Sequence, residues 1–470
     1  MMRRPPQELA ATLAAHGQEH ALRFWDQLDE RQRRSLVAQL AALDLPLIDR
    51  LYRAQRVPAP AVESPAQRAR RAEPPELVSL AELSAAAPRR REASRIGEEL
   101  LAGGRIGVVL VAGGQGTRLG FPHPKGMFPI GPVSGATLFE LLARQALARS
   151  RRAQAAIPYC VMTSDATHDD TVAFFEAHDH FGLPAEDVYF FRQGNMPAVD
   201  AETGRLLLAE KHSLCLSPDG HGGMLAALRE AGLLDLLRQR GVEHLYYHQV
   251  DNPTAIVCDP QFLGLHALAR SQLSTKVVAK KSPEERMGVV VRIDGRTEII
   301  EYSDLPADVA AERNADGTLR IAAGNTAIHA FERAFLESLA GDGDELPFHV
   351  AHKKVPHLDD AGRPVDPAGP NAFKFERFIF DALPRAARAL AVEADRGREF
   401  HPVKNASGDD SPDTARAALS RLHRGWLRAA GCRVPDDVPV EIDPLFALGA
   451  EELREKLPLG GTFDAPVRLA

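Results

Sequence analysis

The residues with the clearest chemical potential follow an apolar run that ends at Val111. Residues 111–120 read Val-Ala-Gly-Gly-Gln-Gly-Thr-Arg-Leu-Gly, and Lys125 follows after Phe-Pro-His-Pro. Because glycine has no Cβ, four glycines in eight residues allow successive backbone N–H groups to face outward and bind phosphate oxygens. Arg118 and Lys125 add positive charge beside this loop. The pattern therefore predicts a phosphate-binding site.

Two common phosphate motifs do not match this loop. A Walker loop ends in Gly-Lys followed by Ser or Thr, whereas Gly120 is followed by Phe121 and Pro122. The dinucleotide-binding fingerprint needs a small residue three positions after Gly116, where this chain has Leu119. A glycine-rich turn without a ligand is the remaining alternative, but such a turn requires neither an arginine nor a lysine.

Other candidate side chains lie far along the chain from the loop. Asp251 follows an apolar run and precedes Asn252-Pro253, where an aspartate either binds a metal or caps a turn. Gln193 before Gly194 is either a loop amide or a group that both donates to and accepts from a base edge. Lys374 and Lys404, taken alone, are typical surface lysines. These four residues gain a role only from the motifs around them.

Those motifs resemble the motifs of the UDP-sugar pyrophosphorylases, and most closely those of the UDP-N-acetylhexosamine pyrophosphorylases. The loop G-G-x-G-T-R-L-G followed by P-K-G carries the resemblance first. Further matching segments occur in family order over roughly residues 100 to 430: Met162-Thr163-Ser164, Phe190-Phe191-Arg192-Gln193-Gly194, Ser217-Pro218-Asp219-Gly220-His221-Gly222-Gly223, Val250-Asp251-Asn252, Val289 to Tyr302-Ser303, Ala323-Gly324-Asn325, Pro370-Asn371-Ala372-Phe373-Lys374 and Pro402-Val403-Lys404-Asn405-Ala406.

The resemblance implies a Mg²⁺-dependent uridylyltransferase. In this reaction a sugar 1-phosphate oxygen attacks the α-phosphorus of UTP, a UDP-sugar forms, and magnesium pyrophosphate leaves. Transfer between two polyanions is limited by charge repulsion and alignment, so cations, amide donors and a metal carboxylate matter more than a nucleophile. The chain has no G-x-S-x-G elbow or other recognisable nucleophile motif. We therefore expect direct in-line displacement without a covalent enzyme intermediate.

The resemblance also assigns roles to individual residues, with UTP and a sugar 1-phosphate as the partners. Asp251 is expected to bind Mg²⁺. The expected catalytic residues are Arg118, Lys125, Asp251 and Lys404. The expected nucleotide-binding residues are Val111, Ala112, Gly113, Gly114, Lys125, Gln193, Gly220, Asp251 and Lys374. The expected sugar-phosphate-binding residues are His221, Glu301, Tyr302, Asn325 and Lys404.

The sugar is the point at which this chain departs from its closest relatives. The acetylhexosamine enzymes carry Pro-Asp-Gly-Asn-Gly-Gly, and His221 replaces the asparagine that touches the sugar. The surrounding frame favours N-acetylglucosamine 1-phosphate, whereas the histidine favours glucose 1-phosphate, the alternative substrate. A non-catalytic UDP-sugar-binding protein is a further alternative. Loss of Asp251, Lys125 or Lys404 would favour it, and all three residues are present. A transferase using TTP, CTP or GTP would not be expected to carry the segments at Gln193 and at residues 218–220.

The elements that must position these residues follow from the apolar pattern. Short apolar runs alternate with amphipathic stretches after residue 100, which is typical of parallel strands covered by helices. The predicted helices span 137–149 and 167–180, and a hairpin turns at Asp294-Gly295. The predicted strands are Ile106–Ala112, Ile157–Thr163, Val188–Phe191, Leu245–Val250, Thr275–Ala279 and Met287–Ile293. The predicted fold is α/β, with a Rossmann-like central mixed sheet flanked by helices.

Three regions are expected along the chain. Residues 1–99 form an N-terminal helical region, in which Leu36, Leu40, Leu43 and Leu47 line one face, followed by a proline-rich linker from Pro58 to Pro75. Residues 100–380 form the catalytic domain. Residues 381–470 form a small C-terminal domain, since the strand pattern ends near Phe378 and a mixed helical tail follows. The arginine clusters at 68–71 and 89–91 are read as solvated surface.

Composition excludes several classes of function. The chain of 470 residues has 57 Lys and Arg against 64 Asp and Glu, a net charge of −7, which disfavours binding to nucleic acid. No apolar run approaches the length of a membrane span, and the N-terminus does not read as a signal peptide, so we expect a soluble cytoplasmic protein. The four cysteines lie far apart and are expected to be buried thiols, and His349, His352 and His357 are expected to be structural. The sequence gives no information on oligomeric state.

Overall fold

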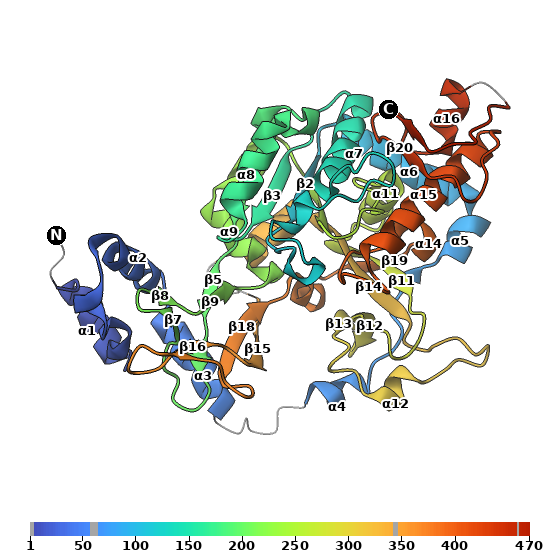
Figure 1. The fold of residues 1–470 in the computed structure, drawn as a ribbon. Helices are drawn as coiled ribbons and strands as arrows, with labels where there is room; N and C mark the ends of the chain where they lie inside the picture. Colours follow the sequence, from blue (N-terminus) through green and yellow to red (C-terminus); the bar gives the residue numbers. More distant parts are fainter. Residues whose placement is uncertain (1–3, 57–63, 342–345, 458–459) are drawn as a thin grey trace. The chain divides into compact units, whose positions relative to one another are not determined.

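The computed structural model describes residues 4–56, 64–341, 346–457 and 460–470 (Figure 1). The chain forms two compact units. The first, here called the small unit, comprises residues 1–63, 193–224 and 346–379, and the second, here called the sheet unit, comprises residues 64–192, 225–345 and 380–470. The chain therefore passes from one unit to the other several times.

The sheet unit is built on a mixed sheet with the strand order β1-β19-β11-β14-β10-β2-β3-β4, and the β12-β13 hairpin pairs with β14. Most neighbours are parallel, but β14 runs antiparallel to both β10 and β11. The strands are β1 Leu77–Val78, β2 Ile106–Val111, β3 Tyr159–Thr163, β4 Val188–Arg192, β10 His244–Gln249, β11 Leu273–Ala279, β12 Val289–Ile293, β13 Arg296–Ile300, β14 Ala323–Glu332 and β19 Ala389–Glu393. The predicted mixed α/β sheet is confirmed.

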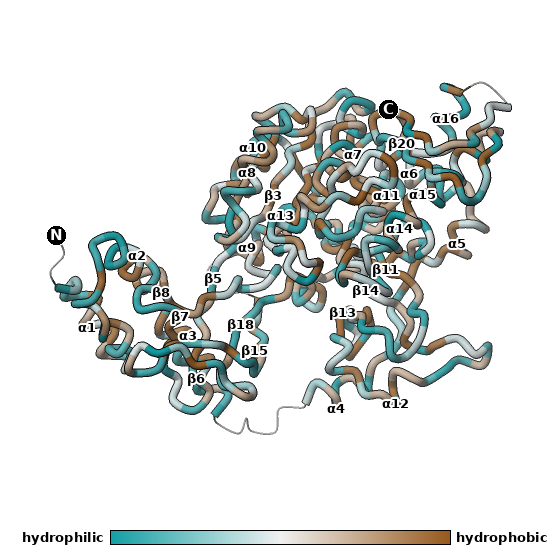
Figure 2. Tube along the Cα trace, viewed as in Figure 1, coloured by the Kyte–Doolittle hydropathy of each residue, from teal (hydrophilic) through white to brown (hydrophobic). Residues whose placement is uncertain are grey.

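The six strands predicted from apolar runs are all present, within two residues at each end. The reason is visible in β3, where all five residues are buried, and in β2, where five of the six are. A parallel strand covered on both faces must be apolar throughout, so its sequence is a continuous apolar run rather than an alternating one. Figure 2 shows these hydrophobic segments in the interior of the sheet unit.

The predicted hairpin is also confirmed. β12 and β13 pair antiparallel, with Ile293 opposite Arg296. The two intervening residues, Asp294 and Gly295, have φ values of 51° and 80°. Positive φ at both central positions is typical of the type I′ turn that joins tight hairpins, and Asp-Gly is one of its preferred sequences.

Helices cover both faces of this sheet (Figure 1). The helices of the sheet unit are α4 Pro65–Ala69, α5 Leu80–Ala85, α6 Ala87–Ala102, α7 Leu138–Ala153, α8 His168–Ala177, α9 Met224–Glu230, α10 Leu233–Gln239, α11 Pro260–Leu268, α12 Ala307–Ala310, α13 Arg333–Leu339, α14 Arg396–Glu399, α15 Pro412–Ala429 and α16 Ala450–Lys456. The helices predicted at 137–149 and 167–180 are therefore present as α7 and α8. Thr137 caps α7, since its side chain accepts a hydrogen bond from the N–H of Glu140 at 3.2 Å.

Two glycines set the closest helix contact of the sheet unit, between α6 and α11. A Cβ on Gly97 would lie 1.8 Å from the carbonyl oxygen of Pro260, and a Cβ on Gly264 would lie 1.7 Å from that of Ala93. No side chain can occupy such a space, so the two helix backbones touch directly.

The C-terminal region contains strands, which corrects the expectation that strands end near Phe378. β19 joins the central sheet, parallel to β1 and β11. Two further strands, β20 Val440–Ile442 and β21 Val467–Leu469, pair parallel beside α15. The segment Ala-Leu-Ala-Val-Glu of β19 has only five residues and only one β-branched residue among them, so only its partners in the folded sheet identify it as a strand.

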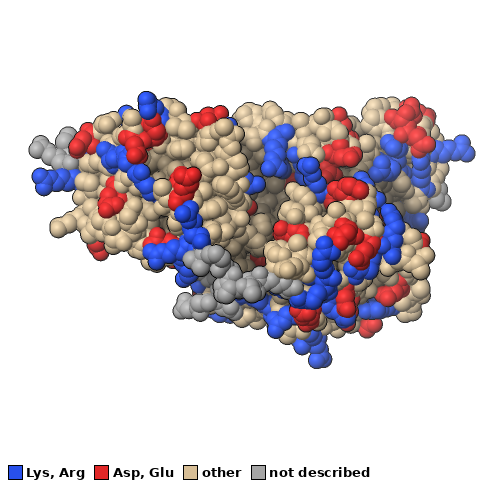
Figure 3. Space-filling view, turned by 90° about the horizontal axis from the view of Figure 1, so that it is seen from below, with Lys and Arg blue, Asp and Glu red and all other residues tan. Residues whose placement is uncertain are grey.

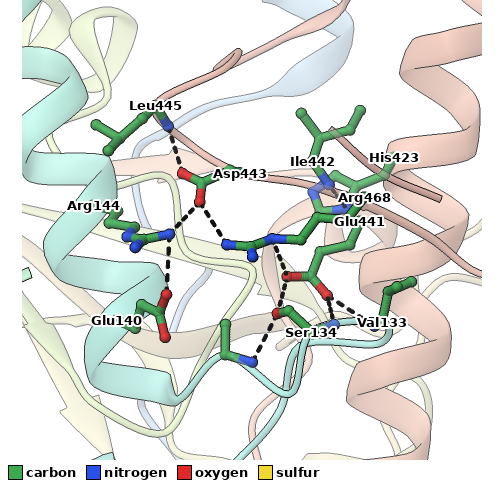
Figure 4. A network of polar contacts seen from close by, with 11 residues as sticks. Val133, Ser134, Glu140, Arg144, His423, Glu441, Ile442, Asp443, Leu445 and Arg468 are labelled. Carbon is green, nitrogen blue, oxygen red and sulfur yellow. Dashed lines mark hydrogen bonds and ion pairs between the residues drawn. The ribbon is translucent and has the colours of Figure 1, made fainter. Parts of the chain in front are cut away.

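A buried carboxylate pair fastens the C-terminal segment to the rest of the sheet unit (Figure 4). Glu441 accepts hydrogen bonds from the N–H groups of Val133 and Ser134, both at 2.8 Å, and from the Ser134 hydroxyl. Asp443 pairs with Arg144 of α7 and, at 3.1 Å, with Arg468. These contacts position β20 against the turn at 131–136 and against α7.

The small unit contains the predicted N-terminal helices, but as separate elements. The helices are α1 Gln7–Ala15, α2 Glu30–Ala41 and α3 Leu45–Arg56, and the strands are β5 Asn195–Pro197, β6 Val199–Asp200, β7 Leu208–Glu210, β8 Ser213–Leu214, β9 Leu216–Pro218, β15 Phe348–Lys353, β16 His357–Leu358, β17 Pro364–Val365 and β18 Ala372–Arg377. Leu36 and Leu40 are buried as expected, but the chain breaks at 42–44, so Leu45 and Ile48 enter the core in place of Leu47.

The proline-rich segment is only partly an open linker. Residues 57–63 lie outside the described residues, but Pro65 occupies the first turn of α4, where its missing N–H costs nothing. The arginines that follow form surface ion pairs: Arg68 with Glu298 at 2.7 Å, Arg70 with Asp308 and Arg71 with Asp294. On the face shown in Figure 3, basic and acidic side chains are interspersed in the same way.

The four cysteines are free and buried, as expected. Among residues 4–56, 64–341, 346–457 and 460–470, no helix is long and apolar enough to cross a membrane. In the same ranges no three His, Cys, Asp or Glu side chains are grouped so that they could hold a metal ion.

Buried histidines make the stability of the sheet unit sensitive to acid. His423 of α15 accepts a hydrogen bond from the N–H of Ile442 at 3.2 Å, and burial lowers its pKa to about 4. Below pH 6.5 the unfolded chain therefore binds a proton that the folded chain excludes, so stability falls as the pH falls from about 6.5 to about 4.

We predict that His423→Asn, which keeps an acceptor for Ile442, reduces this pH dependence. The free energy of unfolding, measured by urea titration between pH 6.5 and 4.5, should change by up to about 1.4 kcal/mol less per pH unit in the variant than in the wild type. Equal pH slopes for the two proteins would contradict a neutral buried His423.

Candidate functional site

The glycine-rich loop leaves the carboxyl end of β2 and is closed by its own backbone. The N–H of Gly116 donates to the His123 carbonyl at 2.9 Å, that of Phe121 donates to Gly116 at 3.1 Å, and that of Lys125 donates to Gly114 at 3.0 Å. Two short 3₁₀ turns, Thr117–Leu119 and Lys125–Met127, complete it. The loop is thus a defined structure before any ligand binds.

The glycines in and beside this loop differ in whether packing leaves room for a side chain. A Cβ on Gly116 would lie 2.8 Å from the carbonyl oxygen of Phe121, and one on Gly126 would lie 2.2 Å from the Phe139 ring, so both are required by packing. A Cβ on Gly114 would meet nothing within 4 Å. Gly114 is exposed, so its backbone is open to a ligand.

A serine from the next strand supports the loop from behind. The Ser164 hydroxyl, just beyond β3, donates to the Gly113 carbonyl at 2.8 Å, and the Ser164 N–H donates to the Thr167 hydroxyl at 3.0 Å. Ser164, the last residue of the segment Met162-Thr163-Ser164, therefore supports the glycine-rich loop.

The structure brings Lys125 and Asp251 together, although 125 residues separate them. β10 pairs parallel with β2, with Gln249 opposite Val111, so the segments that follow the two strands emerge at the same edge of the sheet. The Lys125 ammonium lies 4.0 Å from a carboxylate oxygen of Asp251, and both side chains are partly exposed, at 18% and 15%. Both charged groups can thus reach a ligand. Arg118 is exposed on the loop itself.

Hydrogen bonds with the backbone of Asp251 and the side chain of Asn252 hold the segment that precedes Lys404 at this edge. The Val403 N–H donates to the Asp251 carbonyl at 2.8 Å. The Asn252 amide donates to the Glu399 carbonyl at 2.7 Å, and its oxygen accepts from the His401 N–H at 3.2 Å. Asn252 therefore holds segment 399–403 beside Asp251, and Lys404 follows directly.

A buried ion cluster anchors the same segment. Lys276 of β11 is 2% exposed and binds two carboxylates, those of Asp259 at 2.7 Å and of Glu399. Burial acts to lower the pKa of Lys276, but the two carboxylates outweigh it and hold the pKa above its ordinary value. Sequence analysis missed Lys276, although a lysine inside the apolar run Leu-Ser-Thr-Lys-Val-Val-Ala is a signal for a buried ion pair.

Two of the predicted sugar-binding residues lie beside Gly288. The N–H of Asn325, on β14, donates to the Gly288 carbonyl at 2.8 Å, and its side-chain oxygen accepts from the N–H of Ala327 at 3.0 Å. A Cβ on Gly288 would lie 3.0 Å from a carboxylate oxygen of Glu301. Tyr302 is next in the chain and is 48% exposed. These three residues form one group at the β12-β13 hairpin.

The other predicted residues belong to the small unit. Gln193 is 8% exposed, and the following Gly194 accepts a hydrogen bond from the Asp219 N–H at 3.0 Å. Gly220 has φ +86°, and a Cβ there would lie 2.3 Å from the Arg377 carbonyl. The segment 219–223 therefore packs against the end of β18, the strand that also carries Lys374.

His221 lies in this segment, with one ring nitrogen engaged. Its Nδ1 accepts from the N–H of Ile379 at 3.2 Å, so the proton of the neutral ring lies on Nε2. The ring centroid is 5.4 Å from that of Phe378. Burial, and secondarily the neighbouring His349, lowers the pKa of His221 to about 4. At neutral pH the side chain is therefore an uncharged group.

The three histidines considered for metal binding make packing contacts in the small unit. The His349 ring lies against Phe378 at a tilt of 38°, with 4.6 Å between ring centroids, and the His352 ring centroid lies 5.3 Å from that of Phe373. Nδ1 of His357 hydrogen-bonds the Val355 carbonyl at 3.1 Å. These ring contacts and this hydrogen bond are consistent with the structural role that we expect for the three histidines.

Comparison with known proteins gives consistent results. The family model described as "UTP--glucose-1-phosphate uridylyltransferase" matches residues 64–427. The human UDP-N-acetylhexosamine pyrophosphorylase-like protein 1 is 37% identical over 493 residues, which covers 98% of this chain and 97% of the human one. UDP-N-acetylglucosamine diphosphorylase 2 of Arabidopsis thaliana is 35% identical, covering 99% and 94%.

A solved structure resembles the whole fold. The uridine diphosphate N-acetylglucosamine pyrophosphorylase of Trypanosoma brucei, crystallised with an inhibitor, superposes with a TM-score of 0.82 at 27% identity, covering 97% of this chain and 96% of that one.

The Asn252 contacts make a local prediction. Asn252→Ala removes the partners of the Glu399 carbonyl and the His401 N–H, so segment 399–404 should open more often. We expect hydrogen exchange of the amides in 399–404 to become at least about tenfold faster, and unfolding to cost about 1–3 kcal/mol less. Asn314→Ala, in an exposed turn, is the matched control and should leave 399–404 unchanged. Unchanged exchange in Asn252→Ala would show that Asn252 does not hold this segment.

Proposed function

This chain belongs to the UTP–glucose-1-phosphate uridylyltransferase family, and from that premise we propose that it transfers a uridylyl group from UTP to N-acetylglucosamine 1-phosphate. The relatives that match nearly its whole length are named for UDP-N-acetylhexosamine or UDP-N-acetylglucosamine, which supports this choice of sugar. The observation that carries the proposal is the meeting of Lys125, Asp251 and the segment bearing Lys404 at the edge where the glycine loop opens.

The proposed chemistry is an in-line displacement. An oxygen of the sugar phosphate forms a bond to the α-phosphorus of UTP, the bond from that phosphorus to the bridging oxygen breaks, and pyrophosphate leaves. The backbone of residues 111–114 would bind phosphate oxygens, and Lys125 with Arg118 would offset the negative charge of the triphosphate. Lys404 would do the same for the incoming sugar phosphate. We assign no covalent intermediate to the enzyme.

Asp251 fits a role in holding Mg²⁺. Its carboxylate is partly exposed at the sheet edge, beside the loop proposed to bind the triphosphate. Mg²⁺ is commonly held by one or two carboxylates together with substrate phosphates and water, so a single aspartate is a sufficient protein ligand. When bound, the ion would supply positive charge to the phosphate oxygens.

The remaining assignments complete the proposal. Gln193, Gly220 and Lys374 would contact the nucleotide. Glu301, Tyr302, Asn325 and His221 would contact the sugar. Catalytic residues would then lie mainly in the proposed domain 100–380, with Lys404 supplied from the proposed C-terminal domain 381–470.

Glucose 1-phosphate is the second candidate substrate, favoured by His221 at the position of the relatives' asparagine. The test is a panel in which the protein and Mg²⁺ are incubated with each of UTP, TTP, CTP and GTP, and with either sugar 1-phosphate, while pyrophosphate release is measured. Release only with UTP, and faster with N-acetylglucosamine 1-phosphate, is expected. Tight UDP-sugar binding with no pyrophosphate would instead identify a non-catalytic binding protein.

The metal assignment predicts the behaviour of Asp251→Asn. The amide keeps the shape of the carboxylate but loses its charge, so we expect kcat to fall by about 10²–10⁴-fold while UTP binding, measured by calorimetry, is partly retained. Near-normal activity of this variant at limiting Mg²⁺ would show that Asp251 does not hold the metal.

The sugar assignment predicts a specificity change in His221→Asn. A carboxamide can donate to the acetamido oxygen, and one such hydrogen bond is worth about 0.5–1.5 kcal/mol. The ratio of kcat/KM for N-acetylglucosamine 1-phosphate to that for glucose 1-phosphate should therefore rise by about two- to tenfold. If the ratio does not move, the C2 substituent is read by Glu301, Tyr302 or Asn325 instead.

A further inference from the structure

A chamber lies in the sheet unit, apart from the residues assigned above. It has a volume of about 80 Å³ and lies between α7, α15 and residues 442–448. It opens into a cleft of about 940 Å³, and both are lined by Arg398, Leu422, Trp426 and Leu448. The contacts of Glu441 and Asp443 in Figure 4 hold one wall of the chamber in place. The chamber has room for several waters, or for the head group of a small ligand.

A buried guanidinium faces this chamber. Arg149 of α7 is 8% exposed and lines the chamber, and its Nε has no hydrogen-bond partner. Within the described ranges of the chain, no hydrogen bond or ion pair is found for the rest of its side chain either. Taking an unpaired charge out of water costs several kcal/mol, so a buried arginine without a partner calls for an anion.

The neighbouring charges do not supply that anion. The Asp259 carboxylate acts on Arg149 electrostatically but is hydrogen-bonded to Lys276, which also binds Glu399. Two carboxylates thus face the charges of Lys276 and Arg149, with Arg398 at the mouth as a third cation. Glu98, which also acts on Arg149, is exposed to solvent, which screens it. Arg149 and Arg398 are the charged residues that line the chamber itself, whereas the adjoining cleft carries Asp395, Glu451, Glu452 and Glu455 beside Arg152 and Arg421.

Most of the remaining wall is apolar, and Gln145, Thr254 and His423 are its polar members. Leu141, Leu419 and Ile442 line the chamber, and Trp426 lies where the chamber meets the cleft. A bare inorganic anion would use none of this surface, and a cation would meet the charge of Arg149. A ligand with an anionic head and a flat apolar body satisfies both features.

We propose that this chamber binds a small organic anion, a carboxylate or phosphate monoester with an aromatic body, whose head group pairs with Arg149 and whose body lies against Trp426. Two segments of the chamber wall are continuous in sequence with residues at the proposed catalytic edge. Residues 253–256 form part of its wall and directly follow Asn252, and Arg398 precedes Glu399, whose carbonyl Asn252 binds. A bound ligand therefore touches both segments that Asn252 joins.

The test is calorimetric titration with phenyl phosphate, benzoate and the neutral benzyl alcohol, in saturating UDP-N-acetylglucosamine so that binding in the catalytic site does not contribute. Wild-type protein should bind phenyl phosphate or benzoate with Kd below about 1 mM and benzyl alcohol at least about tenfold more weakly. Whichever anion binds more tightly identifies the head group. Arg149→Met should weaken binding of the anion at least about tenfold.

Two further variants make the test specific. Arg151→Met removes an exposed arginine of the same helix and should leave binding unchanged. Ala447→Leu fills the chamber from its wall and should abolish binding even if Arg149→Met fails to fold. Absence of binding to the wild type, wild-type affinity in Arg149→Met or in Ala447→Leu, or equal affinity for benzyl alcohol and the anions would overturn the proposal.

Discussion

The parallel hydrogen bonding of β2 with β10 is the constraint from which the arrangement of the candidate site follows. With Gln249 opposite Val111, the glycine-rich loop and Asp251 must leave the sheet at the same edge. A slip of one residue in this register would turn the side chains of β10 to the opposite face of the sheet. Because both strands are buried on both faces, packing on either side opposes such a slip.

The contacts that bring Lys404 to this edge are polar and buried. Asn252 carries the direct bonds, and the cluster of Lys276, Asp259 and Glu399 stands behind them. A buried ion cluster adds little net stability over apolar packing, but removal of one partner typically costs about 3–5 kcal/mol. Its value here is geometric: Glu399 can occupy only the position in which Lys276 neutralises it, and that position sets the start of the segment that leads to Lys404.

The elements that could be predicted from the sequence are those with a signal in their own few residues. β2 and β3 are continuous apolar runs, and Asp294-Gly295 is a turn signal that needs no knowledge of the rest of the chain. β19 was missed because its five residues become a strand only through pairing with β11. In the site, motifs pointed to Lys125, Asp251 and Lys404 as candidates. Asn252 was passed over because its role depends on residues 147 and 149 positions away, and no local pattern records that distance.

The division of the small unit among three stretches of chain has a consequence for synthesis. Its core joins Leu13, Leu36 and Leu40 from the N-terminal helices with Phe375 of β18. β18 leaves the ribosome roughly 300 residues after the first stretch ends. At a translation rate of about 5–20 residues per second, β18 is synthesised about 15–60 seconds after the apolar faces of α1 and α2. During that interval the nascent chain presents a hydrophobic surface to chaperones, so the yield of folded protein in a cell should depend on how fast the ribosome traverses the sheet unit.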